Sequence, residues 1–538
     1  MIKKYKIISA IIIISLAVLS SIYVIFNGVI CDIFMDCTQQ LQTYKGSIPI
    51  RDTWGPFCIS AWFVAIVLKL PYMLLGGEQY ILVSKAITAL STALCGTICS
   101  VLLYRNIKLS RWSLFLGTML FYLFLPDYLY TFLCHYTIAY NMVYLSIAVL
   151  VAFLGDNKKI YIVLLAILSA IGILSMPQYL LMALFILVLL LVLPNNSLSK
   201  KNTLFLYCST IGLIGVLVLS YLLANGVNLL DLQYMMTESA HQESLIIRFF
   251  KRLIIIVLIF FIVSIYYEFM RNIKKEDISF GFLVSSLSIT GICVTIITRN
   301  YVLGMRIGYG IIIVLGIWCM LYWRKEINNE KLMIFNAVGF VFAFIVGTFT
   351  NTGAMIMAMG FVFPIIGYLE FRDNDKALMI SPYIIIVLVL LQRLILIDDT
   401  YYTTAFECKY KIESGFMKGQ YVTLNTYDKY NYCKKIMDKY TEPSDVIAIL
   451  NGFTYESGYA LTKAQVGISD YDLFSIENNN YVKYWKLNED KIPNKIFVFE
   501  NADVENYLSN SEYEIVSFIK NNYSAEIIDD NVIIFIRQ

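Results

Sequence analysis

Residues 7–30 read IISAIIIISLAVLSSIYVIFNGVI, and residues 31–55 continue as CDIFMDCTQQLQTYKGSIPIRDTWG. The first stretch is apolar and, at 1.5 Å per residue, long enough to cross a hydrocarbon core of about 30 Å as a helix. Lys3, Lys4 and Lys6 precede it, and it is longer than the usual apolar region of a signal peptide, about 7–15 residues. Because positive flanks stay in the cytoplasm, we expect a retained first span with a cytoplasmic N-terminus. The polar stretch is then a loop on the outer side.

The composition of the whole chain agrees with a membrane protein. Of 538 residues, 59% are hydrophobic and 15% charged, and the mean hydropathy is +0.68. A soluble protein of this size does not need so much apolar surface, so a cytosolic enzyme and a disordered scaffold are excluded. The net charge of +3 forms no basic face outside the loops, so we expect membrane lipids and no nucleic acid as partners.

Further apolar runs of about 18–25 residues predict a polytopic α-helical membrane protein of about 13 transmembrane helices. These runs lie near 80–104, 112–130, 137–154, 160–176, 177–194, 203–225, 253–270, 278–298, 301–322, 332–350, 352–369 and 377–397. Within 160–194, Met176-Pro177 marks either the turn between two full spans or a break. Lys and Arg recur in alternate connections, which assigns those connections to the cytoplasm. We therefore expect a multi-pass protein of the cell membrane, with its C-terminal part periplasmic or extracellular.

The chain divides by charge into a transmembrane part, 1–397, and a soluble part, 398–538. The second part holds 22 acidic and 14 basic residues and is long enough to form its own core. Short β-like runs and one helical stretch predict an extracytoplasmic α/β domain, with a loop around 476–494. The strands are expected at Val446–Leu450, Lys495–Glu500 and Val532–Arg537, and the helix at Glu512–Asn521. A disulfide between Cys408 and Cys433 is a further, weaker expectation.

Polar chemistry gathers in the first outer loop and its juxtamembrane helices, 29–79. Asp32 and Asp36 are four residues apart, so a helix would place both carboxylates on one face, with Gln39 and Gln40 about a turn further. The alternative is a solvated helix end. The turn-rich stretch 46–56 then leads into an apolar helix, 57–75, which we expect to lie on the membrane surface. Acidic residues near the midplane of the spans, which an ion-coupled transporter would need, are not evident.

This arrangement resembles the GT-C superfamily of membrane glycosyltransferases, which includes the protein O-mannosyltransferases and the lipid A aminoarabinose transferases. In that superfamily an acid opens the first outer loop, and a phrase like P-Y-R-D-x-W-x-P leads into a juxtamembrane helix. Here Asp32 opens the loop, and Pro49-Ile-Arg-Asp-Thr-Trp-Gly-Pro56 follows. The similarity continues through Gly76-Gly77-Glu78 to Lys85, where the family often has Arg. Ile33 follows Asp32 where the family often has Glu, so no D-E or D-x-D pair forms.

The resemblance implies transfer of a sugar from a polyprenyl-phosphate donor to a lipid, glycan or protein acceptor on the outer side of the membrane. One carboxylate would act as general base in a single inverting displacement, with Asp32 as first candidate and Asp36 as second. Cations would stabilise the phosphate leaving group. The candidates for binding the substrate and its lipid phosphate are Arg51, Asp52, Lys85, His135, Arg299 and Arg306.

Three questions stay open at this level. Each cation alone is also the kind of residue that extends its charge to the membrane interface. The two histidines share no metal-type spacing, so we assign no metal ligands and no certain cofactor, although a divalent metal is possible. The alternatives to a transferase are a lipid-linked polysaccharide polymerase or ligase, and a lipid-linked oligosaccharide flippase or transporter.

Overall fold

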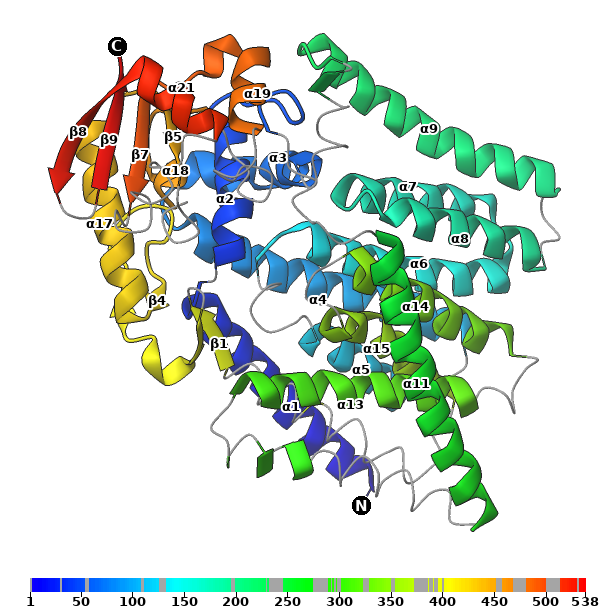
Figure 1. The fold of residues 1–538 in the computed structure, drawn as a ribbon. Helices are drawn as coiled ribbons and strands as arrows, with labels where there is room; N and C mark the ends of the chain where they lie inside the picture. The colour runs from blue at the N-terminus through cyan, green and yellow to red at the C-terminus, as the bar shows by residue number, and fades with distance from the viewer. Residues whose placement is uncertain are drawn as a thin grey trace.

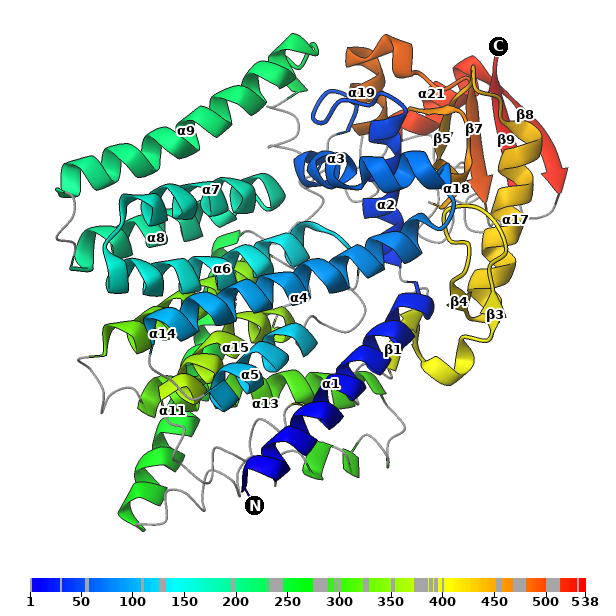
Figure 2. The same cartoon turned by 180° about the vertical axis from the view of Figure 1, so that it is seen from behind.

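In the computed structural model a body of apolar helices is capped at one end by a small α/β domain (Figures 1 and 2). It describes the chain except for residues 1, 30, 54–57, 108–110, 125–131, 195–198, 229, 232–244, 274–288, 292, 295–296, 298–300, 323–328, 350–353, 372–385, 387–389, 391–394, 399–400, 451–456, 468–479, 500–512 and 530–531. For some helical and strand residues, including 31–35, it describes the backbone alone.

The body is built from helices whose sequences are apolar enough for a membrane. Its helices are α1 (Ile2–Phe26), α2 (Cys31–Tyr44), α3 (Cys58–Leu75), α4 (Tyr80–Asn106), α5 (Arg111–Leu123), α6 (His135–Asp156), α7 (Lys159–Ser175), α8 (Tyr179–Val192), α9 (Lys200–Ala224), α11 (Leu245–Asn272), α13 (Tyr301–Tyr322), α14 (Glu330–Phe349) and α15 (Ala354–Phe371). Among the described residues, seven helices are long and apolar enough to cross a membrane: α1, α3, α4, α6, α9, α11 and α14. Shorter apolar helices lie in α7, α8, α13 and α15. The predicted class, a polytopic α-helical membrane protein, is therefore confirmed.

The predicted number of 13 spans is not established, because the runs 278–298 and 377–397 lie largely outside the described residues. The run 160–194 is two helices, α7 and α8, separated at Met176 by an extended backbone. With 14 residues, α8 reaches only about 21 Å. Helix α3 has the length and composition of a span, so its predicted place on the membrane surface stays a prediction.

The helices pack around α6, most of whose side chains are buried. Next to it, α14 and α15 approach closely through small residues. A Cβ atom on Gly339 would lie 2.7 Å from the carbonyl oxygen of Gly360, so only glycine permits this contact. Large apolar side chains on α1, α9 and α11 are exposed, as expected where helices face lipid rather than water.

The C-terminal domain is a mixed five-stranded sheet with helices on both faces. Its elements are α17 (Leu424–Tyr440), β5 (Val446–Ile449), α18 (Ser457–Leu461), β6 (Gln465–Val466), α19 (Asn480–Leu487), β7 (Lys495–Phe499), α21 (Glu514–Asn522), β8 (Tyr523–Asp529) and β9 (Val532–Arg537). The strand order is β6-β5-β7-β9-β8, with β5 parallel to β6 and β7, and β9 antiparallel to β7 and β8. Successive residues of β7 alternate between the two cores, which is why these strands are apolar on both faces. The predicted strands and helix are confirmed.

Two expectations for this domain are wrong. The stretch 476–494 is not simply a loop, because it contains α19 and a short 3₁₀ helix, Glu489–Lys491. Tyr481 and Trp485 are four residues apart and are both buried, so this amphipathic helix covers one face of the sheet. The expected disulfide is absent, because Cys408 and Cys433 are both free and buried in different clusters.

A shorter stretch joins the two parts of the molecule. It contains β1 (Ile395–Asp398), β2 (Tyr401–Thr404), a 3₁₀ helix (Ala405–Glu407), β3 (Tyr410–Lys411) and β4 (Tyr421–Val422). Strands β1 and β2 pair with each other, as do β3 and β4, in antiparallel register. Both views place β4 beside the C-terminal end of α1 (Figures 1 and 2).

Candidate functional site

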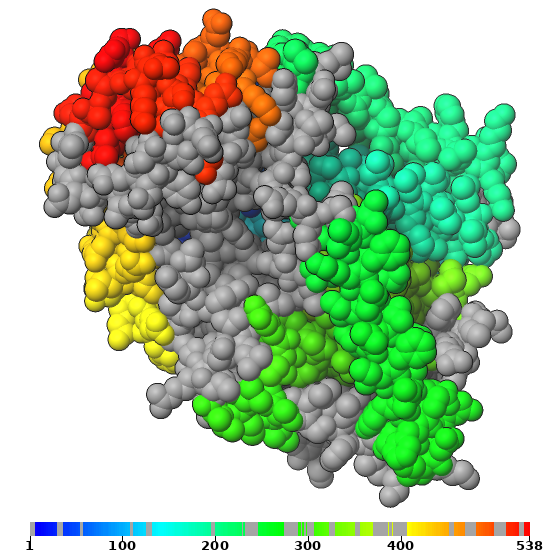
Figure 3. All heavy atoms as spheres, in the orientation of Figure 1, coloured from blue at the N-terminus to red at the C-terminus, as the bar shows by residue number. Residues whose placement is uncertain are grey.

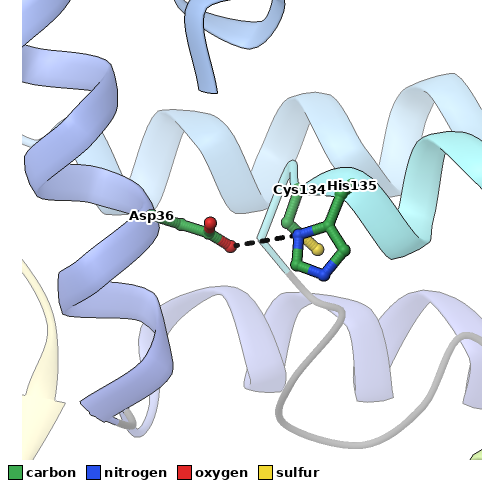
Figure 4. Close-up of side chains that lie close together, drawn as sticks. All are labelled: Asp36, Cys134 and His135. Carbon is green, nitrogen blue, oxygen red and sulfur yellow. Dashed lines mark ion pairs between the residues drawn. The ribbon is translucent and has the colours of Figure 1, made fainter. Parts of the chain in front are cut away.

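Helix α2 brings an acid of the first loop to the start of α6. The Oδ2 atom of Asp36 lies 3.9 Å from Nδ1 of His135, and the side chain of Cys134 lies beside them (Figure 4). The Asp36 side chain keeps 21% of its surface exposed, whereas His135 and Cys134 are buried. A carboxylate that solvent still reaches therefore faces an imidazole held inside the protein.

Gln40 lies one helical turn after Asp36 in α2, so the two side chains lie on the same side of the helix. Gln40 is buried, and its side-chain amide donates to the carbonyl of Leu133 at 3.2 Å. The hydroxyl of Tyr80 donates to the amide oxygen of Gln40 at 3.0 Å. The other backbone group of Leu133, its N–H, donates to Ser84 Oγ at 3.1 Å. Helices α2 and α4 thus hold the segment just before His135.

The first turn of α6 fixes Cys134 and His135 in turn. The backbone N–H of Cys134 donates to Thr137 Oγ1 at 3.0 Å, and that hydroxyl donates to the Cys134 carbonyl at 2.9 Å. These bonds satisfy backbone groups that a helix leaves open at its N-terminus. Burial, followed by the charge of Asp36, raises the pKa of the Cys134 thiol to about 12, so the thiol is protonated at neutral pH.

The same three residues offer the ligand atoms of a divalent metal site. One carboxylate oxygen of Asp36, the Cys134 sulfur and one imidazole nitrogen of His135 lie within 4.8 Å of one another. A carboxylate, a thiolate and an imidazole are ligands that zinc accepts, so the donor set fits such an ion. Bound there, an ion would supply positive charge next to Asp36. No metal site was predicted from the sequence, because Asp36 is far along the chain from the Cys-His pair.

The structure describes the other candidate acid and two of the candidate cations to different extents. Asp32 lies one turn before Asp36 in α2, and only its backbone is described. Arg299 lies outside the described residues. Arg306, near the start of α13, is exposed, and within the described part of the chain no hydrogen bond or ion pair engages its guanidinium.

Arg51 and Asp52 form a pair rather than a free cation and anion. Arg51 donates from Nε and Nη2 to the two carboxylate oxygens of Asp52, at 2.9 and 2.8 Å. Asp52 is buried and also accepts from the N–H of Ile48 at 2.7 Å. Nη1 of Arg51 donates to the carbonyl of Asn225, just after α9, at 2.9 Å. The Arg-Asp dipeptide therefore ties the first loop to the end of α9.

The same turn contacts the C-terminal domain. The Tyr484 hydroxyl of α19 donates to the carbonyl of Asp52 at 3.0 Å, and Lys491 Nζ lies 4.0 Å from the Asp52 carboxylate. Nearby, Lys45 Nζ donates to the carbonyl of Thr462 at 2.6 Å. The first loop thus forms a polar bridge between the helical body and the domain that caps it.

Lys85 is buried in α4 at the C-terminal end of α1. Its ammonium donates to the carbonyls of Val24 and Asn27 at 3.2 Å, and to that of Gly28 at 2.6 Å. A fourth bond, at 2.8 Å, goes to the side-chain oxygen of Gln420. Helix C-termini leave carbonyls open, and a buried cation satisfies them well. These contacts describe a structural lysine that couples α1, α4 and the C-terminal part.

The chain is similar to solved structures of other proteins. Its fold is similar to that of the oligosaccharyltransferase of Archaeoglobus fulgidus, solved with a tethered acceptor peptide that contains the NVT sequon, with a TM-score of 0.45 and 11% sequence identity, over 98% of this chain and 74% of that one. It is also similar to ArnT from Cupriavidus metallidurans bound to undecaprenyl phosphate, with a TM-score of 0.46 and 9% identity, over 98% and 97% of the two chains. No protein-family model and no curated protein sequence matches the chain.

Proposed function

We propose that this protein is an integral-membrane glycosyltransferase that moves a sugar from a polyprenyl-phosphate donor to an acceptor on the outer side of the cell membrane. The observation that carries the proposal is the partly exposed carboxylate of Asp36 held against His135 by three elements, α2, α4 and α6. The resemblance of the first loop to that of the GT-C superfamily, in which an acid opens this loop, supports the choice of an acid on α2. Residues 1–397 form the catalytic part, and residues 398–538 brace its loop.

The carboxylate of Asp36 acts as general base. It takes the proton of the acceptor hydroxyl while that oxygen attacks the anomeric carbon and the bond to the phosphate breaks. One displacement inverts the anomeric configuration. The imidazole of His135, 3.9 Å from the carboxylate, positions it. Asp32, one turn earlier in α2, is the second candidate for the base.

The phosphate that leaves carries growing negative charge and needs a cation. Arg306 is the best candidate among the described residues, because its guanidinium is exposed near the start of α13 and engages no described partner. Arg299, which precedes Arg306 in the sequence, is a second candidate. Arg51 and Lys85 are held by Asp52 and by backbone carbonyls, so we assign them to the architecture of the site.

The experiment that tests this proposal uses membranes that carry the full chain and a panel of labelled polyprenyl-phosphate hexoses and pentoses. The wild-type protein is expected to consume one donor and to release the unlabelled lipid phosphate. Asp36→Asn is expected to lower the rate by about 10²–10⁴-fold, the range for a general base. Asp156→Asn is the matched control, because Asp156 is an exposed acid at the other end of α6. Equal rates in wild type, Asp36→Asn and Asp32→Asn would contradict the assignment of a base on α2.

A further inference from the structure

The stretch from Phe406 to Leu424, which we call the 406–424 segment, is attached to the C-terminal end of α1. The N–H of Gly28 donates to the carbonyl of Tyr421 at 2.9 Å. The side-chain amide of Gln420 donates to the carbonyl of Ile25 at 2.8 Å. These bonds fix the height of the 406–424 segment relative to the membrane-crossing part of α1.

That height is the boundary of the hydrocarbon core. The apolar part of α1, Lys6–Phe26, is 21 residues long and spans about 31 Å, which equals the thickness of a bilayer core. Cys408 packs against Tyr23, which lies in the last turn of this helix. The backbone around residue 408 therefore lies level with the end of the span, where aromatic residues gather at membrane interfaces.

Several side chains that this segment exposes suit such an interface, although the acids Glu407 and Glu413 are exposed as well. Phe406 is 75% exposed and Leu424 is 49% exposed, and Tyr410 is exposed as well. Lys409 and Lys411 stand next to them and are also exposed. Large apolar side chains are costly in water, whereas rings that sit in the interface beside lysines whose charge reaches the headgroups are stable there. In Figure 3 the yellow spheres of this segment lie at the left margin of the molecule.

We propose that the 406–424 segment inserts into the interface of the membrane that α1 crosses, with Phe406 as its deepest side chain. The partner is the lipid surface at the face where α1 ends. Anchoring there holds the α/β domain at a fixed height over the first loop, in addition to the bonds made by Lys45 and Tyr484. The inference needs only that α1 crosses the membrane, and it does not depend on the proposed activity.

The test replaces Phe406 by the photoreactive residue benzoylphenylalanine in the full chain, reconstituted in phosphatidylcholine nanodiscs. The matched control carries the same residue at Lys520, an exposed position on α21 in the part of the domain far from α1 (Figure 1). Illumination is expected to give several-fold more lipid adducts at position 406 than at position 520. Equal adducts at the two positions, or adducts at 406 only with another protein chain, would overturn the proposal.

A second measurement does not depend on crosslinking. Phe406→Trp and Lys520→Trp are each reconstituted with phosphatidylcholine brominated near the headgroup end of its acyl chains, and the fluorescence is compared with that of the wild type. The added tryptophan is expected to be quenched at position 406 and not at position 520. Both substitutions are at exposed sites, so both variants are expected to fold. Absence of additional quenching at 406 would contradict insertion.

Discussion

The carboxylate of Asp36 and the imidazole of His135 face each other at 3.9 Å, although three described helices, α3, α4 and α5, lie between α2 and α6 along the chain. This distance is longer than a hydrogen bond. The imidazole ring therefore restricts the positions that the carboxylate can take, and the carboxylate keeps its negative charge. The pair is the feature around which the proposed chemistry is built.

Substitution of His135 tests this positioning role. His135→Asn removes the ring and leaves room for the carboxylate to move. Because a misplacement of about 1 Å can cost roughly 100-fold in rate, we expect transfer to fall by up to about 10²-fold, less than for Asp36→Asn. Rates are measured on the donor that the panel identifies, with protein amounts matched. A rate unchanged from the wild type would show that His135 does not position the base.

Gln40 is predicted to be needed for the stability of the site. Gln40→Leu leaves the buried carbonyl of Leu133 without its donor, which costs about 1–3 kcal/mol. We expect a lower unfolding temperature in detergent together with reduced transfer. Gln465→Leu, at an exposed position of β6, is the control and should leave both unchanged. Equal unfolding temperatures for the two variants would contradict the role given to Gln40.

The Arg51–Asp52 pair is expected to behave as one unit. Arg51→Ala leaves the buried carboxylate of Asp52 without its bidentate partner and should destabilise the protein by about 1–3 kcal/mol. Asp52→Asn in the same chain removes the charge that was stranded. The double variant should therefore lose less stability than the sum of the two single variants, as a double-mutant cycle measures. Strict additivity would mean that the two side chains act independently.

The contact between the first loop and the C-terminal domain should depend on pH through Lys45. Burial lowers the pKa of Lys45 from 10.5 to about 8. Between these two values the unfolded chain keeps a proton that the folded protein has released, so the stability of the fold rises with pH across this window. Lys45→Met should flatten that part of the curve of unfolding temperature against pH, whereas Lys463→Met, at an exposed neighbour, should not. Parallel curves for all three proteins would contradict this.

Metal removal distinguishes a base from a ligand at Asp36. The first loop has no D-E or D-x-D pair, so we expect transfer to continue after treatment with a chelator. The measurement compares donor consumption before and after chelation, and after zinc, manganese or magnesium is added back. If chelation abolishes transfer and one ion restores it, the carboxylate of Asp36 is a metal ligand, and the base lies elsewhere on the loop.

Much of the fold could be predicted from local patterns. Apolar runs of span length gave the helical body, and the apolar runs at 446–450, 495–500 and 532–537 marked the central strands of the sheet. The helix α19 was missed because it is only eight residues long. A single pair of aromatic residues at i and i+4, Tyr481 and Trp485, is weak evidence for a helix in a single sequence.

The site was harder to predict, because its parts come from distant segments. The spacing of Asp32 and Asp36 pointed to one face of a helix, but no local pattern links that face to Cys134 and His135. Likewise, a lysine such as Lys85 has the same chemistry whether it binds a phosphate or the open carbonyls at a helix end. Only the fold shows that the carbonyls of α1 are its partners.

We propose above all that a carboxylate on α2 is the base of a sugar transfer. The most direct measurement is release of unlabelled polyprenyl phosphate and formation of labelled product by wild type, Asp36→Asn, Asp32→Asn and Asp156→Asn at matched expression. We expect product with wild type and Asp156→Asn and a loss of about 10²–10⁴-fold with Asp36→Asn. Wild-type rates in both Asp36→Asn and Asp32→Asn, on a donor that the wild-type protein consumes, would contradict it.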